Sequence, residues 1–365
     1  MQLLILDENL DILGPVSIFT TLIWTRRYQG LGAFELYTSK DYFQLLNSGR
    51  YLYRSDADEL GVIREVCYEQ SDDGSRSVYA KGNFAECLLY DRIIDGTVTL
   101  SGNLETVMRS LVTKFCISPS DSDRVIKRLS LGDTAGLTAT VDSQVTGENL
   151  SDELYALGNV EGYSHRIRYD FAANILYFEV WQGKDRRDSQ TENSWAIFSN
   201  AFYNIKNATY TRDESSYRNF AYIAGEENED GARTVVEVDL RSDTGETRRE
   251  LYVDARDLQS EDEDGNTLGA SEYEAQLVAR GQEKLAEYQK SESVSSAVDA
   301  QGNLIYKEDY DLGDYCTYVN TEIGVEMEQQ ITEIQETYEG AAMSLSITLG
   351  NDGVSTIQQL IRREA

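Results

Sequence analysis

The last regular stretch of the sequence constrains the fold most strongly, because it alternates strictly between apolar and polar residues. From position 343 to position 349 an apolar residue stands at every second place, and serine or threonine fills the places between. Successive side chains of a β-strand point to opposite faces of a sheet, so a period of two predicts a strand with one buried face. The pattern therefore predicts a half-buried strand at residues 343–349.

Shorter apolar segments separated by polar turns recur through the rest of the chain. The sequence predicts strands at residues 2–6, 33–37, 62–68, 77–80, 166–171, 175–181, 236–240, 251–253, 304–310, 315–319 and 330–338. Hairpin turns are predicted at residues 71–74, 172–174 and 242–245, because glycine, asparagine and aspartate favour tight turns between strands. Many short strands at this spacing are typical of a barrel or a sandwich, so we expect a mainly β protein.

Two segments have a helical period instead. Apolar residues at positions 104, 107, 108, 111, 112 and 115 share one face of a helix; Ser101 or Asn103 can cap its start, and Pro119 lies beyond its end. A second helix is predicted from Ser271 to about residue 288, because Ser271 and Glu274 have the spacing of a capping box. These helices indicate α/β insertions between the β regions.

Composition is that of an ordinary globular protein with many acidic residues. The 365 residues, 41% of them hydrophobic, are enough to bury a sizeable core and favour two or three domains. The net charge of −31 argues against attachment to nucleic-acid phosphates or an anionic membrane, which both require clustered Lys and Arg. Tyr occurs 24 times against 10 Phe, which fits a β-rich oligomer with aromatic interfaces, although a monomer with a large surface gives the same count.

Residue types that carry catalysis or bind metals are scarce. The cysteines at positions 67, 87, 116 and 316 form no CxxC pair, and we expect them to be small buried hydrophobes. His165, the single histidine, has no metal-ligand spacing around it and is predicted to lie outward at the start of a strand. No phosphate-binding glycine loop, HExxH or GxSxG motif occurs, so we expect no catalytic residue, no cofactor and no metal. With 64 acidic residues, a catalytic carboxylate pair stays an open alternative without a signal of its own.

The acidic run at Asp262, Asp264 and Asn266 resembles half of a calcium loop. Its sixth position is Thr267, where an EF-hand has glycine, and its twelfth is Tyr273, where an EF-hand has glutamate. We therefore expect a solvated turn.

Neither a targeting segment nor a membrane span is predicted. The first residues include acids where a signal peptide needs bases, and no apolar run approaches the roughly 20 residues of a membrane span. We therefore expect synthesis and folding in a reducing cytoplasm.

Three stretches form an ordered series of motifs. The first is Trp24, Arg26, Arg27 and Tyr28, followed by glycines and by Phe-Glu-Leu at 34–36; the second covers residues 174–187 and continues through 219–222 and 248–256. The third comprises the turn with Gly313 and Asp314, the strand with Ile331, and the closing Leu349 and Gly350. In this order, from about residue 20 to 350, the motifs resemble the tail hub family of siphophages and prophages, relatives of the hub ring above the spike of contractile tails.

The resemblance implies a mainly β fold with α/β insertions. Two hub β-barrel domains per subunit would form a pseudo-sixfold ring as a homotrimer, together with a smaller α/β domain. The expected division is a first barrel at 1–100, the α/β domain at 101–200, a second barrel from 201–256 and 301–351, an acidic turn and helix insertion at 257–300, and a C-terminal tail at 352–365. Residues 117–152 and 257–300 match no part of the family pattern.

The implied function is structural rather than enzymatic. The ring would continue the tail tube or distal tail protein, adapt sixfold to threefold symmetry, leave an acidic lumen through which DNA passes unbound, and dock a spike, fibre or tail lysin. Trp24, Arg26, Arg27 and Tyr28 are candidate subunit-interface residues, because aromatic and arginine side chains are enriched at interfaces. Two alternatives stay open: a tail-associated enzyme acting on carbohydrate or peptidoglycan, and a generic β-rich binding module.

Overall fold

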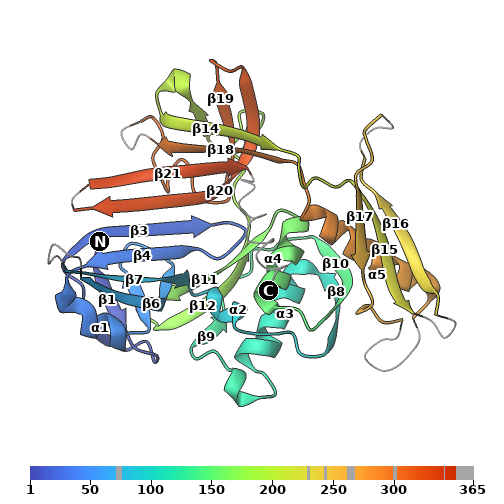
Figure 1. The fold of residues 1–365 in the computed structure, drawn as a ribbon, viewed down its shortest axis with the longest axis horizontal. Helices are drawn as coiled ribbons and strands as arrows, with labels where there is room; N and C mark the ends of the chain where they lie inside the picture. Colours follow the sequence, from blue (N-terminus) through green and yellow to red (C-terminus); the bar gives the residue numbers. More distant parts are fainter. Residues whose placement is uncertain are drawn as a thin grey trace.

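A computed structural model of the chain describes residues 1–70, 76–227, 231–241, 245–260, 268–298, 302–340 and 342–350. The fold is mainly β, as predicted, with five α-helices in the described part (Figure 1). None of the helices in these ranges is long and apolar enough to cross a membrane.

One large sheet runs through both ends of the chain. Its order is β14-β18-β21-β20-β3-β4-β7-β6-β5-β1-β2, with β19 paired to β20 and β13 to β19. The strands from the first part of the chain are β1 (Leu3–Leu6), β2 (Ile12–Pro15), β3 (Phe19–Arg27), β4 (Ala33–Thr38), β5 (Tyr51–Arg54), β6 (Leu60–Gln70) and β7 (Arg76–Phe84). Those from the last part are β13 (Ile197–Ser199), β14 (Ile205–Asp213), β18 (Ser291–Val298), β19 (Tyr315–Asn320), β20 (Val325–Glu339) and β21 (Ala342–Gly350).

The middle of the chain packs helices and two small sheets beside the first strands. Its elements are α2 (Cys87–Tyr90), β8 (Thr97–Asn103), α3 (Leu104–Val112), β9 (Leu129–Leu131), β10 (Thr140–Thr146), α4 (Leu150–Val160), β11 (Ser164–Asp170) and β12 (Ile175–Trp181). Helix α1 (Phe43–Ser48) lies earlier, between β4 and β5. Short 3-10 helices occur at Lys40–Tyr42, Ser122–Arg124 and Asn200–Phe202, and a π-helical turn at Thr113–Ile117 extends α3.

A separate three-stranded sheet projects from the body, on the right of Figure 1. It consists of β15 (Phe220–Glu227), β16 (Arg233–Asp239) and β17 (Glu250–Asp254), and helix α5 (Ala270–Ala286) covers one face. The helix also contacts α4 and β10 of the middle part, so it connects this sheet to the body.

Four apolar cores account for the packing of the residues that the structure describes. One lies inside the first strands around Trp24 and Phe34, and another joins those strands to α3 and α4. A third lies among the last strands around Ile331 and Leu349, and the fourth lies between β15–β17 and α5. The first core contains side chains of both β1 and β3, which are distant in the sheet order, so the sheet curls around it. Strand pairing among the described residues does not close either β region into a barrel.

Several predicted elements are confirmed. The alternating segment at 343–349 is β21, which pairs with β20, and β20 in turn pairs with β3 of the first β region. The hairpin with its turn at 172–174 is β11–β12. Helix α3 starts where its period predicts, and Asn103 rather than Ser101 caps it, because the Asn103 side chain accepts the Thr106 N–H at 3.0 Å. The predicted turn at 71–74 and the run Asp262, Asp264 and Asn266 lie outside the described residues, as do the first three residues of the predicted turn at 242–245.

The predicted hairpin between residues 236–240 and 251–253 is wrong. Strands β16 and β17 do not pair with each other; β15 lies between them, antiparallel to β16 and parallel to β17. The reason is burial, since β15 buries five of its eight residues and takes the central place, while its partners are mostly exposed. A strand that is covered on both sides has a more continuously apolar sequence than an edge strand has.

Two further local predictions also fail. Residues 304–310 form a turn instead of a strand: Lys307 has a left-handed backbone (φ 69°), and its N–H donates to the Tyr310 carbonyl at 2.8 Å. Helix α5 begins one residue before Ser271, with Gly269 at its N-cap and no side-chain capping bond there, so the predicted capping box does not form.

Candidate functional site

The strand pair β3–β20 joins the first β region to the last and brings most of the sequence-predicted residues together. Seven residue pairs link the two strands, from Glu333 opposite Arg27 to Glu339 opposite Thr21, with Trp24 opposite Glu336. We call this pair, with the loop of residues 304–314 that packs on it, the junction. It holds an unusual number of buried charges.

At the centre of the junction, Arg54 and Glu336 form an ion pair at 2.6 Å, with each side chain 1% exposed. The Arg54 guanidinium lies 4.9 Å from the centre of the Trp24 ring, a cation–π contact. Glu336 also accepts the hydroxyl groups of Tyr306 and Tyr338. Burial alone would raise the pKa of Glu336, but the Arg54 charge and these hydrogen bonds outweigh it and lower the pKa, so the carboxylate stays ionised.

A second buried cation, Arg26, lies on the same strand pair. Its guanidinium bonds Glu59 at 2.6 Å and Asp311 at 2.5 Å, and it donates to the Tyr306 hydroxyl at 2.9 Å. Burial would raise the pKa of Glu59, yet the Arg26 charge and hydrogen bonds from Trp24 and Arg26 lower it to about 2. Tyr306 therefore connects the two ion pairs into one network.

The turn containing Gly313 and Asp314 closes the junction. Gly313 has φ +83°, which favours glycine, and Gly313 and Asp314 exchange backbone hydrogen bonds with Ile331 at 2.8 Å. Asp314 is buried and binds Arg186 at 2.7 Å, and it also accepts the Lys184 N–H at 2.7 Å. The predicted signature positions are thus bonded to one another.

Leu349 and Gly350 complete this group on the neighbouring strand. Leu349 pairs with Ile331 across β20 and β21, and both are fully buried. Gly350 has φ +77°, and its carbonyl accepts the Thr332 hydroxyl at 2.5 Å. The final turn of the sheet is therefore held to β20.

The two predicted sets of residues meet at Tyr28. A methyl group at Gly313 would lie 2.5 Å from the Tyr28 ring, so the glycine permits that ring to pack on the turn. Trp24 and Tyr28 are fully buried and Arg26 nearly so, while Arg27 is half-exposed and bonds Glu333 at 2.8 Å. Because their observed contacts lie within the chain, a role at the subunit interface stays a prediction.

Sequence reasoning did not single out Arg54, Glu59, Tyr306 or Glu336. A signal was present for Glu336, since in the predicted strand it shares the face of Ile334, two residues earlier, which is buried. An acid on the apolar face of a strand requires a buried partner. Its partner could not be read from sequence, because Arg54 comes from a strand five places away in the sheet order.

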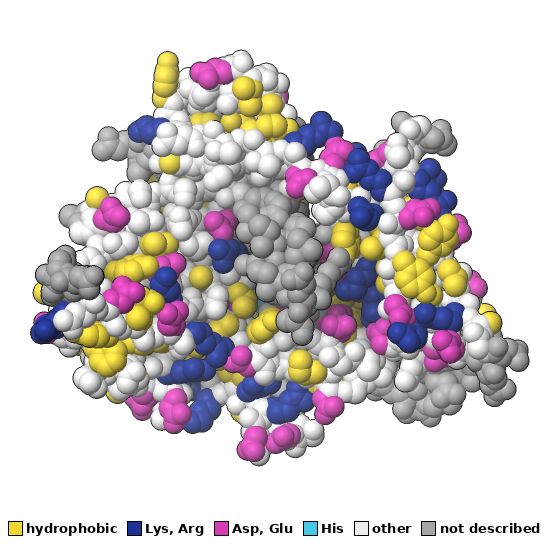
Figure 2. All heavy atoms as spheres, viewed as in Figure 1, with side chains coloured by type: hydrophobic (Ala, Val, Ile, Leu, Met, Phe, Trp, Pro, Cys, Tyr) yellow, Lys and Arg dark blue, Asp and Glu magenta, His cyan; other side chains and the backbone are white. Residues whose placement is uncertain are grey.

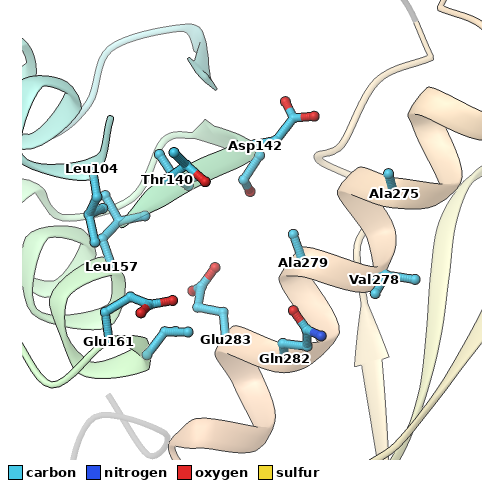
Figure 3. Close-up of a pocket in the computed structure, with 13 residues that line it drawn as sticks. Leu104, Thr140, Asp142, Leu157, Glu161, Ala275, Val278, Ala279, Gln282 and Glu283 are labelled. Atoms are coloured by element: carbon cyan, nitrogen blue, oxygen red, sulfur yellow. The ribbon is translucent and has the colours of Figure 1, made fainter. Parts of the chain in front are cut away.

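A second cluster of charges lies where α5 contacts the body. A cleft of about 300 Å³ is lined by residues of α5, α4 and β10 beside this contact, and Figure 3 shows the carboxylates of Glu161 and Glu283 pointing into it. Glu153 on α4 and Glu283 on α5 are both buried. Burial together with their mutual repulsion raises the pKa of Glu153 to about 8. Arg280 spans the contact, donating to the Gln144 carbonyl at 2.7 Å and binding Asp257 at 2.9 Å.

His165 is buried, contrary to the prediction that it lies outward. It is 3% exposed, its ring centre lies 4.1 Å from that of Tyr155, and burial lowers its pKa to about 3. The reason is strand phase: His165 shares a face with Ile167 and Tyr169, which are also buried.

Three of the four cysteines are buried, as predicted, and Cys67 is half-buried; all four are free thiols. Burial raises the pKa of Cys87 to about 11 and that of Cys116 to about 12, which keeps these thiols protonated and unreactive. In the described ranges no three His, Cys, Asp or Glu side chains are grouped so that they could hold a metal ion.

Comparison with known proteins gives one family and several similar folds. The sequence model of a family described as Siphovirus ReqiPepy6 Gp37-like protein matches residues 2–351. A prophage tail protein, gp18 of Listeria monocytogenes EGD-e, has a similar structure with a TM-score of 0.57 at 17% identity, covering 99% of each chain. No curated protein matches.

Two more solved structures share the fold. The tail protein of Neisseria meningitidis MC58 has a TM-score of 0.55 at 13% identity and covers 93% of this chain and 94% of its own. The 43 kDa tail protein of prophage MuSo2 from Shewanella oneidensis has a TM-score of 0.56 at 13% identity, covering 96% and 98%. The resemblance expected from the ordered motifs is confirmed at the level of family and fold.

Proposed function

This chain belongs to the Siphovirus ReqiPepy6 Gp37-like family, and from that premise we propose that it is a structural subunit of a phage tail tip and not an enzyme. The observation that carries the proposal is the similarity in fold to three tail proteins, two of them from prophages, over at least 93% of each chain. The buried charges of the junction support a structural role, because their partners are other residues of the chain and leave no free acid–base pair there.

We propose further that the subunit forms a homotrimeric hub ring with pseudo-sixfold symmetry. Each subunit would contribute two barrel-like regions, which the β3–β20 pair connects: one at 1–100, and one predicted at 201–256 with 301–351. Within the second, β15–β17 form a separate sheet, so its wall would come from β14 and β18–β21. The curl of the first strands around their core and the contact of Arg54 with Glu336 across that curl support a barrel-like shape for the first region. Residues 101–200 would be the smaller α/β domain. The predicted insertion at 257–300 includes β18, which pairs with β14 and β21 of the large sheet, and the predicted tail at 352–365 lies outside the described residues.

The ring is proposed to continue the tail tube and to dock a spike, fibre or lysin. Synthesis in the bacterial cytoplasm would precede assembly into the virion. An acidic lumen would repel passing DNA, consistent with the net charge of −31. Figure 2 shows acidic and basic side chains interspersed on one face of the subunit. The acidic wall of the lumen would therefore lie on a different face.

The proposal is tested by the mass of the purified protein in solution. Light scattering at several concentrations and moderate salt would give a species of three 41.2 kDa subunits, and electron microscopy of that species would show a ring with a central opening. The same measurement in the presence of a tail tube protein covers assembly that requires its partner. A monomer under every condition, including the mixture, would contradict the ring.

A further inference from the structure

The cleft beside the contact of α4 and α5 has apolar walls that come from two parts of the chain. Its volume is about 300 Å³ (Figure 3). Apolar side chains line it on both sides: Leu104 and Leu157 from the body, and Ala275, Val278 and Ala279 from α5. Val160, the last residue of α4, also lines it and is 45% exposed. Removing such apolar surface from water is favourable, so the cleft fits an apolar occupant.

The charged residues that line the cleft are all acidic: Asp142, Glu161 and Glu283. Glu283 binds Arg280 and Lys284 of its own helix, at 3.5 and 3.8 Å. Asp142 and Glu161 are exposed, and among the described residues neither has an ion-pair partner. Glu161 is the C-cap of α4, whose last turn has no basic residue, so its carboxylate adds to the negative end of the helix dipole. The cleft therefore favours an occupant that carries positive charge as well as apolar side chains.

Residues 351–365, which follow β21 and lie outside the described part of the chain, have a sequence with both properties. Apolar residues recur there at the spacing of one helical face, at Val354, Ile357, Leu360 and Ile361. Arg362 and Arg363 come next, and residues 354–363 contain no acid. An isolated helix of this length is marginal in water, so such a segment needs a surface for its apolar face.

The large sheet holds the start of this segment near the end of α5. β21 ends at Gly350, which pairs with Ser293 on β18. The Tyr288 N–H still donates to a carbonyl in the last turn of α5, and the five residues from Tyr288 to Ser293 span at most about 17 Å. Crossing from Ser293 to Gly350 adds about 5 Å. The seven residues from Gly350 to Ile357 span up to about 24 Å, so the apolar face can reach the end of α5, which lines the cleft.

We propose that residues 354–363 bind in this cleft of their own chain as an amphipathic helix. The apolar face packs on the apolar walls, and Arg362 and Arg363 lie beside the carboxylates of Asp142 and Glu161. The covalent connection favours the chain's own segment over that of another copy, because it gives a local concentration on the order of millimolar. The bound segment contacts both α4 and α5 and holds the projecting sheet against the body. The inference does not depend on the proposed tail function.

The first test is hydrogen exchange of the full chain, followed by mass spectrometry. Ile357→Asp combined with Ile361→Asp puts two charges on the apolar face and should release the segment from the cleft. The amides of residues 275–283 on α5 should then exchange at least threefold faster than in the wild type. Equal rates in the two proteins would overturn the proposal.

The matched control is Ser355→Asp combined with Gln359→Asp. These two residues lie on the opposite face of the same helical pattern, so the control adds the same charge to the same segment. It should leave the exchange of residues 275–283 at the wild-type rate. Equally fast exchange in the control would show that the apolar face does not protect α5, and it would also overturn the proposal.

A second test reverses the charges of the proposed ion pairs. Arg362→Glu combined with Arg363→Glu should speed the exchange of residues 275–283, and adding Glu161→Arg should restore at least half of the protection. Glu8→Arg is the control for this rescue, because Glu8 is an exposed acid of the first β region. If Glu161→Arg restores no more protection than Glu8→Arg, the arginines do not bind at the cleft.

A disulfide test distinguishes the chain's own segment from that of another copy. Val160→Cys and Ile361→Cys, combined in one chain and oxidised, should form a bond within that chain, which keeps the mass of 41.2 kDa. The wild type, with its four free cysteines, gives the background. A product that links two chains above this background, without the internal bond, would overturn binding within the same chain.

Discussion

Arg54 and Glu336 are 282 positions apart in the sequence, yet they form an ion pair at 2.6 Å in which each side chain is 1% exposed. Arg54 ends β5 and Glu336 lies in β20, and four strands separate them in the sheet order. The pair therefore connects two distant strands of a curled sheet across the Trp24 ring. A contact of this kind stabilises the curl as well as the two β regions.

Replacing Glu336 with Gln should destabilise the chain strongly. The substitution leaves the buried Arg54 cation with one ionic partner, the exposed Asp56 carboxylate at 3.2 Å, and breaking a buried pair in this way costs about 3–5 kcal/mol. Urea unfolding, followed by far-UV circular dichroism, measures the loss as a lower midpoint.

The neighbouring pair Arg27–Glu333 is the matched control for this prediction. It joins the same two strands at 2.8 Å, but its side chains are 34% and 29% exposed. Solvent screens such a pair, so Glu333→Gln should cost about 1 kcal/mol or less. Equal losses for the two variants would mean that burial of the Arg54 pair does not matter.

Gly313→Ala should also be costly, and for a different reason. The residue has φ +83°, where an alanine is strained by about 1–2 kcal/mol, and its methyl group would lie 2.5 Å from the Tyr28 ring. Crowding of a packed core adds about 1–3 kcal/mol, so we expect a total loss of about 2–5 kcal/mol. Gly324 has a similar φ of +66° with no atom within 4 Å, so Gly324→Ala should show the strain alone. A loss at Gly313 no larger than that at Gly324 would refute the packing argument.

Local patterns in the sequence were enough to predict a helix or strand when its type does not depend on which element it pairs with. The alternation at 343–349 and the helical period from 104 to 115 depend only on which face of one element is buried. The same logic, carried through consistently, also puts His165 on the buried face of β11. The prediction that it lies outward failed because its polar side chain was given more weight than its phase in the strand.

Features that depend on long-range pairing could not be predicted in this way. The sequences of β15, β16 and β17 all favour β structure, so local patterns do not show which of the three strands lies in the centre. In the structure β15 lies between β16 and β17. The buried network of Arg26, Arg54 and Glu336 likewise arises only when the curled sheet brings distant strands together. The sequence predicted Arg26 as part of a motif, and in the structure its ionic partners are Glu59 and Asp311 of the same chain.

The start of α3 gives a direct test of a choice that the sequence left open. Asn103 caps the helix and also donates from its side chain to the Leu137 carbonyl at 2.7 Å, whereas Ser101 is exposed. Asn103→Ala should cost about 1–2 kcal/mol, because it removes the cap. Ser101→Ala should change the free energy of unfolding by less than about 0.5 kcal/mol. The reverse order in chemical denaturation would mean that Ser101 is the cap.

The contact between α4 and α5 should weaken as the pH rises. Burial raises the pKa of Glu153 from an ordinary value near 4.5 to about 8, and its repulsion with Glu283 acts in the same direction. Arg280 and Lys284 on α5 oppose this shift, while Glu148, just before α4, adds to it. The folded chain thus holds a proton that the unfolded chain releases. The resulting stability is complete below about pH 4.5 and is lost as the pH rises through about 8.

Glu153→Gln tests this linkage, because it removes the titrating group and keeps its size. Between about pH 5 and about pH 9, the free energy of unfolding in urea should fall more for the wild-type chain than for the variant. The difference should be on the order of 3 kcal/mol. Hydrogen exchange of α5 locates the effect: its amides should lose protection in the wild type at high pH and keep it in Glu153→Gln. Glu272→Gln, on the exposed first turn of α5, is the matched control and should titrate like the wild type. Parallel pH profiles for wild type and Glu153→Gln would show that the Glu153 proton does not hold α5 against the body.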